Sequence, residues 1–356
     1  MAPLIIKFHS NSDLFDTRVC ITAQHREMLD QVLDFFEIIP DYDLNLMKPG
    51  QDLFSLTAEI IKSLKSVLEG FKPDYVFVHG DTTTTLASSL ASFYAGAKIC
   101  HVEAGLRTFN KHSPYPEEIN RQLTGRLSDF HFAPTEKAKN NLIGEGITEN
   151  IVVTGNTVID SLFQGIERLK NHKSDFISLI QPYLKKNKKI ILVTGHRREN
   201  HGEGFENICQ ALRAIAMKRE DVIIVYPVHL NPKVKDPVNL HLSNLTNTFL
   251  VAPLSYPDFL WLMNQSTIII TDSGGVQEEA PSLGKPVLVM RNTTERPEAV
   301  EAGTVVLVGT NKELIEKETV DLLENSQRYK QMSELHNPYG DGFASEKIVT
   351  FIKNIT

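Results

Sequence analysis

Cysteine is scarce in this sequence, and long hydrophobic runs are absent. The three cysteines, Cys20, Cys100 and Cys209, lie far apart and form no C-x-x-C pair, which argues against a disulfide framework and a zinc site. No apolar stretch reaches the roughly 18 residues of a membrane span, and the N-terminus lacks the layout of a signal peptide. We therefore expect a protein of the reducing cytoplasm, without membrane insertion.

Positive charge is also in short supply. The 37 lysines and arginines face 44 aspartates and glutamates, a formal net charge of -7. This balance argues against nucleic acid or an anionic membrane as the main partner, although it permits a local basic pocket for a phosphorylated metabolite. The apolar content of 41% is that of an ordinary soluble protein, and 356 residues suggest two domains.

Short β-branched runs recur along the chain, and each is followed by a turn signal and a helical pattern. Continuous apolar strands that alternate with helices predict an α/β fold with doubly wound parallel sheets. The predicted strands are Tyr75–Val78, Ile99–Val102, Ile151–Val153, Ile190–Val193, Val222–Val225, Ile268–Ile270, Val287–Val289 and Val305–Val308.

Polar, lysine-rich stretches between residues 160 and 190 favour a domain boundary there. Both halves show the same strand, turn and helix pattern. We expect two similar sheet domains that face a cleft, with ligands at the carboxyl ends of the strands.

Acidic residues follow two of the predicted strands. Asp81 lies in His79-Gly-Asp-Thr-Thr-Thr, and Glu103 lies in His101-Val-Glu-Ala-Gly. Two carboxylates from adjacent strand ends would face one pocket. The alternative for Asp81 is a structural one, since either Asp81 or Thr82 would cap the helix that follows.

A third acidic group opens a helix after a proline, in Pro116-Glu-Glu-Ile-Asn-Arg. Glu117 and Arg121 are spaced i and i+4, so they share one face of that helix. This spacing fits a surface ion pair, and its position soon after Asp81 and Glu103 also fits a catalytic site.

The second half places cations and glycines at strand ends. His196 and Arg198 follow the strand Ile190–Val193, and they suit a pyrophosphate. The run Ser273-Gly274-Gly275 joins a strand to a helix N-terminus, where unpaired N–H groups and the helix dipole favour an anion. A capping serine and a tight turn are the structural alternative.

Three further features of the second half are notable. Glu278 and Glu279 exceed what helix capping needs, so we expect at least one of them to bind a sugar hydroxyl. His229, in a turn that ends a strand, suits a ligand or a scaffold role equally. The loop from Arg291 to Glu298 is too polar and too distinctive for a plain connector.

Taken together, these motifs resemble the bacterial non-hydrolysing UDP-N-acetylglucosamine 2-epimerases in order and spacing across nearly the whole chain. The motifs are His79-Gly-Asp-Thr-Thr-Thr, His101-Val-Glu-Ala-Gly-Leu-Arg-Thr, Pro116-Glu-Glu-Ile-Asn-Arg, Gly195-His-Arg-Arg-Glu-Asn, Tyr226-Pro-Val-His-Leu-Asn-Pro, Thr271-Asp-Ser-Gly-Gly-Val-Gln-Glu-Glu-Ala-Pro-Ser-Leu-Gly-Lys-Pro and Asn337-Pro-Tyr-Gly-Asp-Gly.

The resemblance implies the glycosyltransferase-B (GT-B) architecture of two Rossmann-like domains. On this basis we place the N-terminal domain at residues 1–157, completed by a C-terminal helix at 343–356, and the UDP-binding domain at 158–342. It also implies a homodimer.

The resemblance implies interconversion of UDP-N-acetylglucosamine (UDP-GlcNAc) and UDP-N-acetylmannosamine (UDP-ManNAc) without metal or NAD, supplying bacterial surface polysaccharide synthesis. UDP leaves C1 as C2 loses its proton, and UDP then adds back to 2-acetamidoglucal. Asp81, Glu103 and Glu117 are the implied proton-transfer and cation-stabilising carboxylates, and Arg121 positions the sugar or a carboxylate.

The resemblance also implies which residues bind the UDP part of the substrate. His196 and Arg198 would hold the departing diphosphate. Ser273, Gly274 and Gly275 would supply backbone donors, and Glu279 would accept from the ribose hydroxyls.

Some family members have a second, regulatory UDP-GlcNAc site, which the resemblance places at Gln24, His25 and His229. Here Glu27 stands where regulated members have glutamine, and an acid that faces a nucleotide would weaken such a site. Allosteric activation is therefore left open.

The start of the chain departs from the family pattern. Family members begin with a strand and a Gly-Thr-Arg-Pro-Glu-Ala-Ile-Lys loop before Met-Ala-Pro-Leu, whereas this sequence begins at Met1-Ala-Pro-Leu4. Since the first strand of a Rossmann-like sheet lies centrally, its absence would leave strand edges unpaired. We expect a start at an internal methionine or a poorly active form, with a functional short form as the alternative.

Three rival functions remain at this point. A GT-B glycosyltransferase would pass the sugar to an acceptor, and a hydrolysing epimerase would release free N-acetylmannosamine and UDP. An inactive UDP-sugar-binding form is the third. Exchange of the C2 proton with solvent and analysis of the products separate them.

Overall fold

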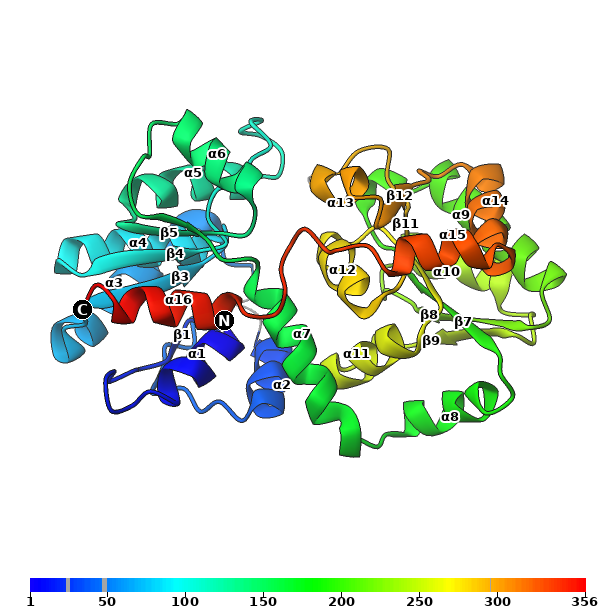
Figure 1. The fold of residues 1–356 in the computed structure, drawn as a ribbon, viewed down its shortest axis with the longest axis horizontal. Coiled ribbons are helices and arrows are strands. Elements are labelled where there is room, and N and C mark those ends of the chain that lie inside the picture. Colours follow the sequence, from blue (N-terminus) through cyan, green and yellow to red (C-terminus); the bar gives the residue numbers. More distant parts are fainter. Residues whose placement is uncertain (24–25, 47–49, 295) are drawn as a thin grey trace. The chain divides into compact units, whose positions relative to one another are not determined.

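The computed structural model describes residues 1–23, 26–46, 50–294 and 296–356 (Figure 1). Packing divides the chain into two units. The first comprises Met1–Phe163 together with Tyr339–Thr356, and the second comprises Gln164–Pro338. Helix α7 (Thr157–Arg168) runs through the point of division.

The first unit contains two parallel sheets. The larger has the strand order β3-β4-β5-β6, and the smaller pairs β1 with β2. Among the described residues, β3 therefore has a strand neighbour on one side only. The strands are β1 (Cys20–Ile21), β2 (Tyr42–Asp43), β3 (Tyr75–His79), β4 (Lys98–Val102), β5 (Phe130–Ala133) and β6 (Ile151–Val153).

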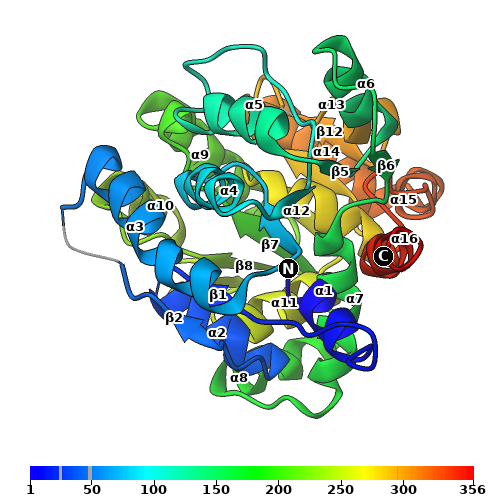
Figure 2. The ribbon, with the colours of Figure 1, turned by 90° about the vertical axis from the view of Figure 1, so that its left-hand side faces the viewer.

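Helices cover both faces of the larger sheet. On one face, Phe130 and Phe132 of β5 pack with Leu4 of α1 and Ile348 of α16, helices from opposite ends of the chain that lie side by side in Figures 1 and 2. On the other face, α3 and α4 pack with Val76. The helices are α1 (Ala2–His9), α2 (Arg26–Phe36), α3 (Leu53–Phe71), α4 (Thr83–Ala95), α5 (Glu117–Leu127), α6 (Glu136–Gly144) and α16 (Ala344–Lys353).

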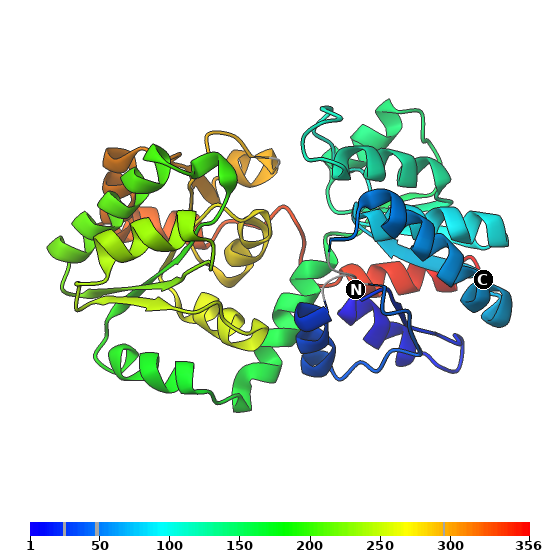
Figure 3. The same cartoon turned by 180° about the vertical axis from the view of Figure 1, so that it is seen from behind.

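The second unit is built on one six-stranded parallel sheet, seen from behind in Figure 3. Its strand order is β9-β8-β7-β10-β11-β12, so the order reverses between β7 and β10. Such a reversal is where open α/β sheets bind ligands. The strands are β7 (Lys189–Thr194), β8 (Val222–Pro227), β9 (Thr248–Val251), β10 (Ile268–Thr271), β11 (Val287–Val289) and β12 (Val305–Leu307).

An apolar cluster joins α9, α10 and α14 to one face of this sheet, with Ile191, Ile224 and Ile270 among its fully buried members. The remaining elements lie around the sheet and at its strand ends. The α-helices are α8 (Asp175–Leu184), α9 (Glu203–Lys218), α10 (Pro232–Leu242), α11 (Tyr256–Gln265), α12 (Gly274–Glu279), α13 (Pro297–Glu301), α14 (Lys312–Glu324) and α15 (Ser326–Ser333), and the 3₁₀ turns are η1 (Leu169–Asn171), η2 (Arg198–Asn200) and η3 (Ala280–Leu283).

The predicted α/β class is confirmed, and all eight strands expected from β-branched runs are present within a residue or two. Four strands were missed. The short β1 and β2 have two residues each, β5 is Phe-His-Phe-Ala without a β-branched residue, and β9 carries only Thr248 and Val251 of that kind.

Candidate active site

The first group of candidate residues lies at the carboxyl ends of β3 and β4. These strands pair in parallel with His79 opposite Val102, and the N–H of Gly80 donates to the Val102 carbonyl at 3.0 Å. Asp81 and Glu103 therefore leave neighbouring strand ends, as the sequence predicts. Gly80 has φ +67°, and an added Cβ there would lie 3.3 Å from the Glu103 carboxylate.

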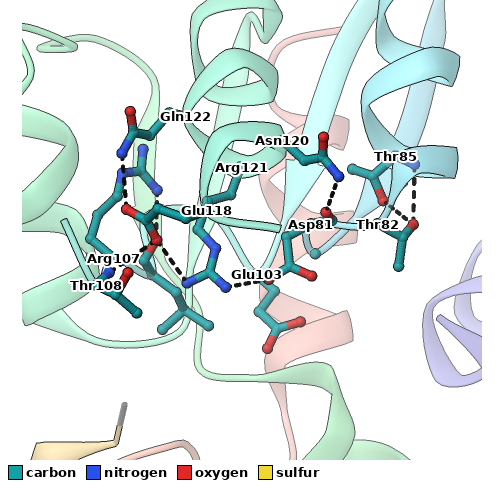
Figure 4. Close-up of polar contacts among 12 residues, drawn as sticks. Asp81, Thr82, Thr85, Glu103, Arg107, Thr108, Glu118, Asn120, Arg121 and Gln122 are labelled. Atoms are coloured by element: carbon teal, nitrogen blue, oxygen red, sulfur yellow. Dashed lines mark hydrogen bonds and ion pairs between the residues drawn. The ribbon is translucent and has the colours of Figure 1, made fainter. Parts of the chain in front are cut away.

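The Asp81 carboxylate faces Arg121 and does not cap α4. The N-cap is Thr82, whose hydroxyl accepts from the Thr85 N–H at 3.2 Å. Asp81 Oδ2 accepts from Arg121 Nη2 at 2.7 Å, and the Asn120 side chain donates to the Asp81 carbonyl at 2.9 Å (Figure 4). Helix α5 thus holds both the backbone and the side chain of Asp81.

The two adjacent acids of α5 have different surroundings. Glu118 is fully buried and accepts from the N–H of Thr108 (Figure 4). It also accepts from the N–H of Phe109. Burial alone would raise its pKa, but these hydrogen bonds and the Arg121 charge hold the pKa of Glu118 below its usual value. Glu118 is therefore a structural carboxylate.

Glu117 begins α5 and is partly exposed. The i and i+4 spacing suggested an ion pair with Arg121, but Arg121 instead contacts Asp81 and, at 3.4 Å, Glu118. The Glu117 side chain makes no hydrogen bond or ion pair with the residues that the structure describes. Of the two acids, Glu117 is the one available to a ligand.

Glu103 is held from two sides in an unusual backbone conformation. Its φ is 64°, in the left-handed region that non-glycine residues seldom adopt. Oε1 accepts from the Asn156 amide at 3.3 Å, and Oε2 lies 3.4 Å from His79 Nε2. Burial lowers the pKa of His79 to about 3, so at neutral pH the imidazole is uncharged beside Glu103.

Sequence reasoning missed the supporting residues of this first unit. His79 and Asn120 lie inside motifs that it quoted, but Asn156 is about fifty residues from Glu103 and gave no local signal. The sheet brings Asn156 to Glu103, because the residues that follow β6 lie at the same edge of the sheet as those that follow β4.

The second group of candidates lies where the strand order reverses in the second unit. Thr194 and Thr271 end β7 and β10, lie opposite each other, and join through their hydroxyls at 2.5 Å. His196 and Arg198 follow β7, whereas Ser273, Gly274 and Gly275 follow β10. Parallel pairing of the two strands brings these segments together.

Asp272 connects the two segments. Its side chain is fully buried, and Oδ2 accepts from the N–H groups of His196 and Arg197 at 2.8 and 2.9 Å. The His196 side chain is 52% exposed and lies 5.3 Å from the ring of His229, nearly parallel to it. Arg198 is exposed at the start of η2.

The backbone donors of the Ser273 turn are fewer than the sequence suggested. The Ser273 N–H already donates to the Thr271 hydroxyl at 2.9 Å. The N–H groups of Gly274 and Gly275 lie in the first turn of α12, where a helix offers no partner. These two, rather than Ser273, are the N–H groups open to an anion.

The absence of a side chain has a different consequence at each of the two glycines. A Cβ at Gly275 would meet nothing within 4 Å, which is the open approach that the sequence predicted. A Cβ at Gly274 would lie 2.5 Å from Arg296 Nη1. Gly274 therefore makes room for a guanidinium, and Arg296 is a cation at this turn that sequence reasoning placed only within a distinctive loop.

Glu278 and Glu279 also separate into two roles. Glu278 is buried and accepts from Arg296 Nε at 2.5 Å. Glu279 is partly exposed, and burial together with the Glu278 charge raises its pKa from 4.5 to about 8. At neutral pH Glu279 is therefore largely a protonated acid, able to donate as well as to accept.

Two candidates of the suggested regulatory site, Gln24 and His25, lie outside the described residues. Within the described ranges no group of three or more histidines, cysteines and acids is placed to hold a metal ion, and every helix is too short or too polar to span a bilayer. All three cysteines are free thiols.

Comparison with known proteins places this arrangement in a family. The family model described as UDP-N-acetylglucosamine 2-epimerase matches residues 7–353. A UDP-N-acetylglucosamine 2-epimerase of Yersinia pestis is 58% identical over 99% of this chain and 95% of its own length. One of Escherichia coli K12 is 55% identical over the same shares.

A solved structure agrees with the sequences. The UDP-GlcNAc 2-epimerase of Neisseria meningitidis, crystallised with UDP-GlcNAc, has a TM-score of 0.90 and 53% identity, covering 99% of this chain and 96% of that one. This likeness also confirms the predicted GT-B class of fold. The chain therefore belongs to the UDP-N-acetylglucosamine 2-epimerase family.

Proposed function

We propose that this protein interconverts UDP-GlcNAc and UDP-ManNAc by inverting C2, without releasing free sugar. The observation that supports this most strongly is the pair of carboxylates, Asp81 and Glu103, on adjacent strand ends of a chain that belongs to this family. The relatives from Yersinia pestis and Escherichia coli are named UDP-N-acetylglucosamine 2-epimerases, which supports the epimerase part of the proposal.

The proposed reaction is an elimination followed by its reverse. The bond from C1 to the UDP oxygen breaks and its electron pair leaves with UDP, while an enzyme base takes the C2 proton. A double bond forms between C1 and C2, giving 2-acetamidoglucal. UDP then returns to C1, and an enzyme acid delivers a proton to the opposite face of C2.

The first unit supplies the proton-transfer groups in this proposal. Asp81, Glu103 and Glu117 are carboxylates that accept or deliver the proton and oppose the positive charge that builds at C1. General acid and base catalysis contributes about 10² to 10⁴ in rate per group. Arg121 contacts the Asp81 carboxylate at 2.7 Å and so holds it in one orientation.

The second unit supplies the groups that bind UDP. His196, Arg198 and Arg296 bring donors toward the diphosphate, and the N–H groups of Gly274 and Gly275 add uncharged donors. Glu279 binds the ribose hydroxyls. Because the bond that breaks forms again with the same UDP, tight retention of UDP is part of catalysis rather than a by-product of binding.

Incubation of UDP-GlcNAc with the protein in D₂O tests the proposal. We expect deuterium at C2 of both nucleotide sugars and an approach to equilibrium between them, followed by NMR. Free N-acetylmannosamine with UDP would indicate a hydrolysing enzyme. Binding of UDP-GlcNAc with no exchange at C2 would indicate a binding protein and would contradict the proposal.

A matched pair of variants tests whether Glu117 takes part in proton transfer or is only an acidic residue at the start of a helix. Glu117 and Glu136 are the first residues of α5 and α6. Glu117→Gln is expected to lower kcat by about 10² or more, since one proton-transfer group is lost. Glu136→Gln should leave kcat unchanged, and equal effects from the two changes would remove Glu117 from the proposed site.

A further inference from the structure

We propose that Asp272 is a positioning residue that fixes the ring orientation and the tautomer of His196. This inference rests on the proposed role of His196 at the diphosphate, but the arrangement can be tested without catalysis. It deepens the account of the site because Asp272 follows β10 whereas His196 follows β7.

The first argument is the way in which Asp272 holds the loop. Its carboxylate oxygen Oδ2 accepts from two successive N–H groups, those of His196 and Arg197, and its carbonyl accepts from Arg197 Nε at 3.1 Å. One fully buried residue thus fixes the backbone on both sides of the His196 Cα. Hydrogen bonds to a charged acceptor are stronger than those between neutral groups.

The second argument is the other carboxylate oxygen. Among the described residues Asp272 Oδ1 is buried and has no hydrogen-bond partner. It lies 3.8 Å from His196 Nδ1. A buried carboxylate oxygen without a donor is costly, so a shift of the half-exposed imidazole that brings Nδ1–H onto Oδ1 is favoured.

The third argument is that the surroundings leave the imidazole few other orientations. The ring of His229 lies against that of His196, with an angle of 10° between their planes. The preceding Gly195 is also fixed, because the buried Tyr226 hydroxyl donates to its carbonyl at 3.0 Å and an added Cβ would lie 3.2 Å from that hydroxyl. The loop is therefore held up to His196 itself.

The chemical consequence follows from the two nitrogens of the ring. When Nδ1–H donates to Asp272, the neutral imidazole leaves Nε2 without a proton, on the side away from the buried carboxylate. On protonation Nε2 becomes a donor. His196 can then accept a proton or donate a hydrogen bond at Nε2 while its ring stays in place. This suits a residue beside the diphosphate of UDP, whose charge changes as the bond to C1 breaks and forms.

Nitrogen-15 NMR of histidine in the full-length wild-type protein tests the tautomer directly, with His196 assigned from the spectrum of His196→Gln. We expect His196 to carry its proton on Nδ1 above its pKa. A neutral His196 with the proton on Nε2 would overturn the proposal. This measurement stands even if the protein shows no exchange at C2, in which case the proposed function fails and the arrangement is judged separately.

Asp272→Asn is the complementary variant. An amide oxygen still accepts from the two backbone N–H groups, but its NH₂ would face Nδ1 and favour the opposite tautomer. We expect kcat to fall by at least about 10²-fold, in line with the loss seen when an aspartate that orients a catalytic histidine becomes asparagine. KM should change by less than about threefold, because uniform binding of the substrate is kept.

Glu206→Gln is the matched control, since it breaks another contact of an acid with a histidine, that of Glu206 on α9 with His241 on α10. It should change neither kcat nor the His196 signals. Equal losses from both variants, or Asp272→Asn with a normal kcat and an unchanged His196 tautomer, would overturn the proposal. If Asp272→Asn does not fold, the wild-type tautomer decides.

Discussion

The two units use the same local design with opposite charge. In the first, the strand ends carry carboxylates, and a buried guanidinium from α5 stands behind Asp81. In the second, cationic side chains follow the strands, and buried carboxylates hold this region. Asp272 accepts from the N–H groups of His196 and Arg197, and Glu278 accepts from Arg296. In each unit a buried group of one sign fixes exposed groups of the other sign.

This comparison shows why the exposed residues could be found more easily than their supports. A charged side chain at a strand end is visible as a motif, whereas its support comes from a neighbouring strand or helix. The support is also what gives the exposed group a defined direction, since Arg121 contacts the Asp81 carboxylate and Asp272 accepts from the N–H of His196.

The largest effect is expected from removing the negative charge of Asp81 in the first unit. Asp81→Asn removes the carboxylate but can still accept from Arg121, so the fold should survive while kcat falls by about 10² to 10⁴. Rates of C2 exchange and UDP affinity, measured together, check this. A large loss of UDP affinity with unchanged kcat would place Asp81 in binding instead of proton transfer.

The next effect concerns the glycines of the second unit. Gly274→Ala would place a Cβ 2.5 Å from Arg296 Nη1, so Arg296 must move, and UDP should bind about tenfold more weakly through loss of a charge-assisted contact. Isothermal titration with UDP measures this affinity.

Gly275→Ala provides the comparison, because its Cβ meets nothing within 4 Å. The free protein should be as stable as the wild type or slightly more so, since alanine favours a helix over glycine by about 1 kcal/mol. Any weaker UDP binding by Gly275→Ala then reports on the approach of phosphate alone. If Gly274→Ala binds UDP like the wild type, Arg296 does not contact the diphosphate.

A pH-dependent effect separates Glu279 from the charged acids of the first unit. The folded protein keeps the Glu279 proton up to a pKa of about 8, whereas the unfolded chain loses it near 4.5. Between these values the unfolded state binds fewer protons, so this residue makes the free energy of unfolding fall as pH rises.

Glu279→Gln removes that contribution. Relative to the wild type, the variant should gain stability as pH rises from about 4.5 to 8, with the difference complete above the folded pKa. Thermal unfolding of both proteins across this range measures it. A difference in Tm that is independent of pH would mean that Glu279 is ionised at neutral pH.

The smallest effect distinguishes a cap from a site residue. Thr82 caps α4, so Thr82→Ala should lower the free energy of unfolding by about 1 kcal/mol. Asp81→Asn, one residue earlier, should have a smaller effect on stability and a far larger one on kcat. Chemical denaturation of the two variants checks the order, and a reversed order would make Asp81 the structural residue.

The sequence predicted well those features that depend on local pattern. Buried parallel strands appear as β-branched runs, and their carboxyl ends located Asp81, Glu103, His196 and the Ser273 turn. It was wrong about the partner of Arg121, which contacts Asp81 and Glu118 instead of Glu117. The different surroundings of adjacent acids also depend on packing, since Glu118 accepts from the N–H of Thr108 and Glu278 accepts from Arg296.

Long-range support was also hidden from the sequence. Asp272 appeared as part of a turn, because its partners lie some 75 residues away and are backbone N–H groups, which every residue has. The Ser273 N–H was expected to be open, but a hydroxyl two residues earlier takes it. Such facts depend on register and on side-chain rotamers rather than on residue type.

The packing of α16 against α1 has a consequence for synthesis on the ribosome. Residues 164–338 form their unit from one continuous segment, whereas residues 1–163 receive α16 only after residues 164–338 have been made. Until then the apolar face around Phe130 and Phe132 lacks its cover. The part of the chain that is made first is thus the last to complete its core, and apolar surface exposed over that interval favours aggregation.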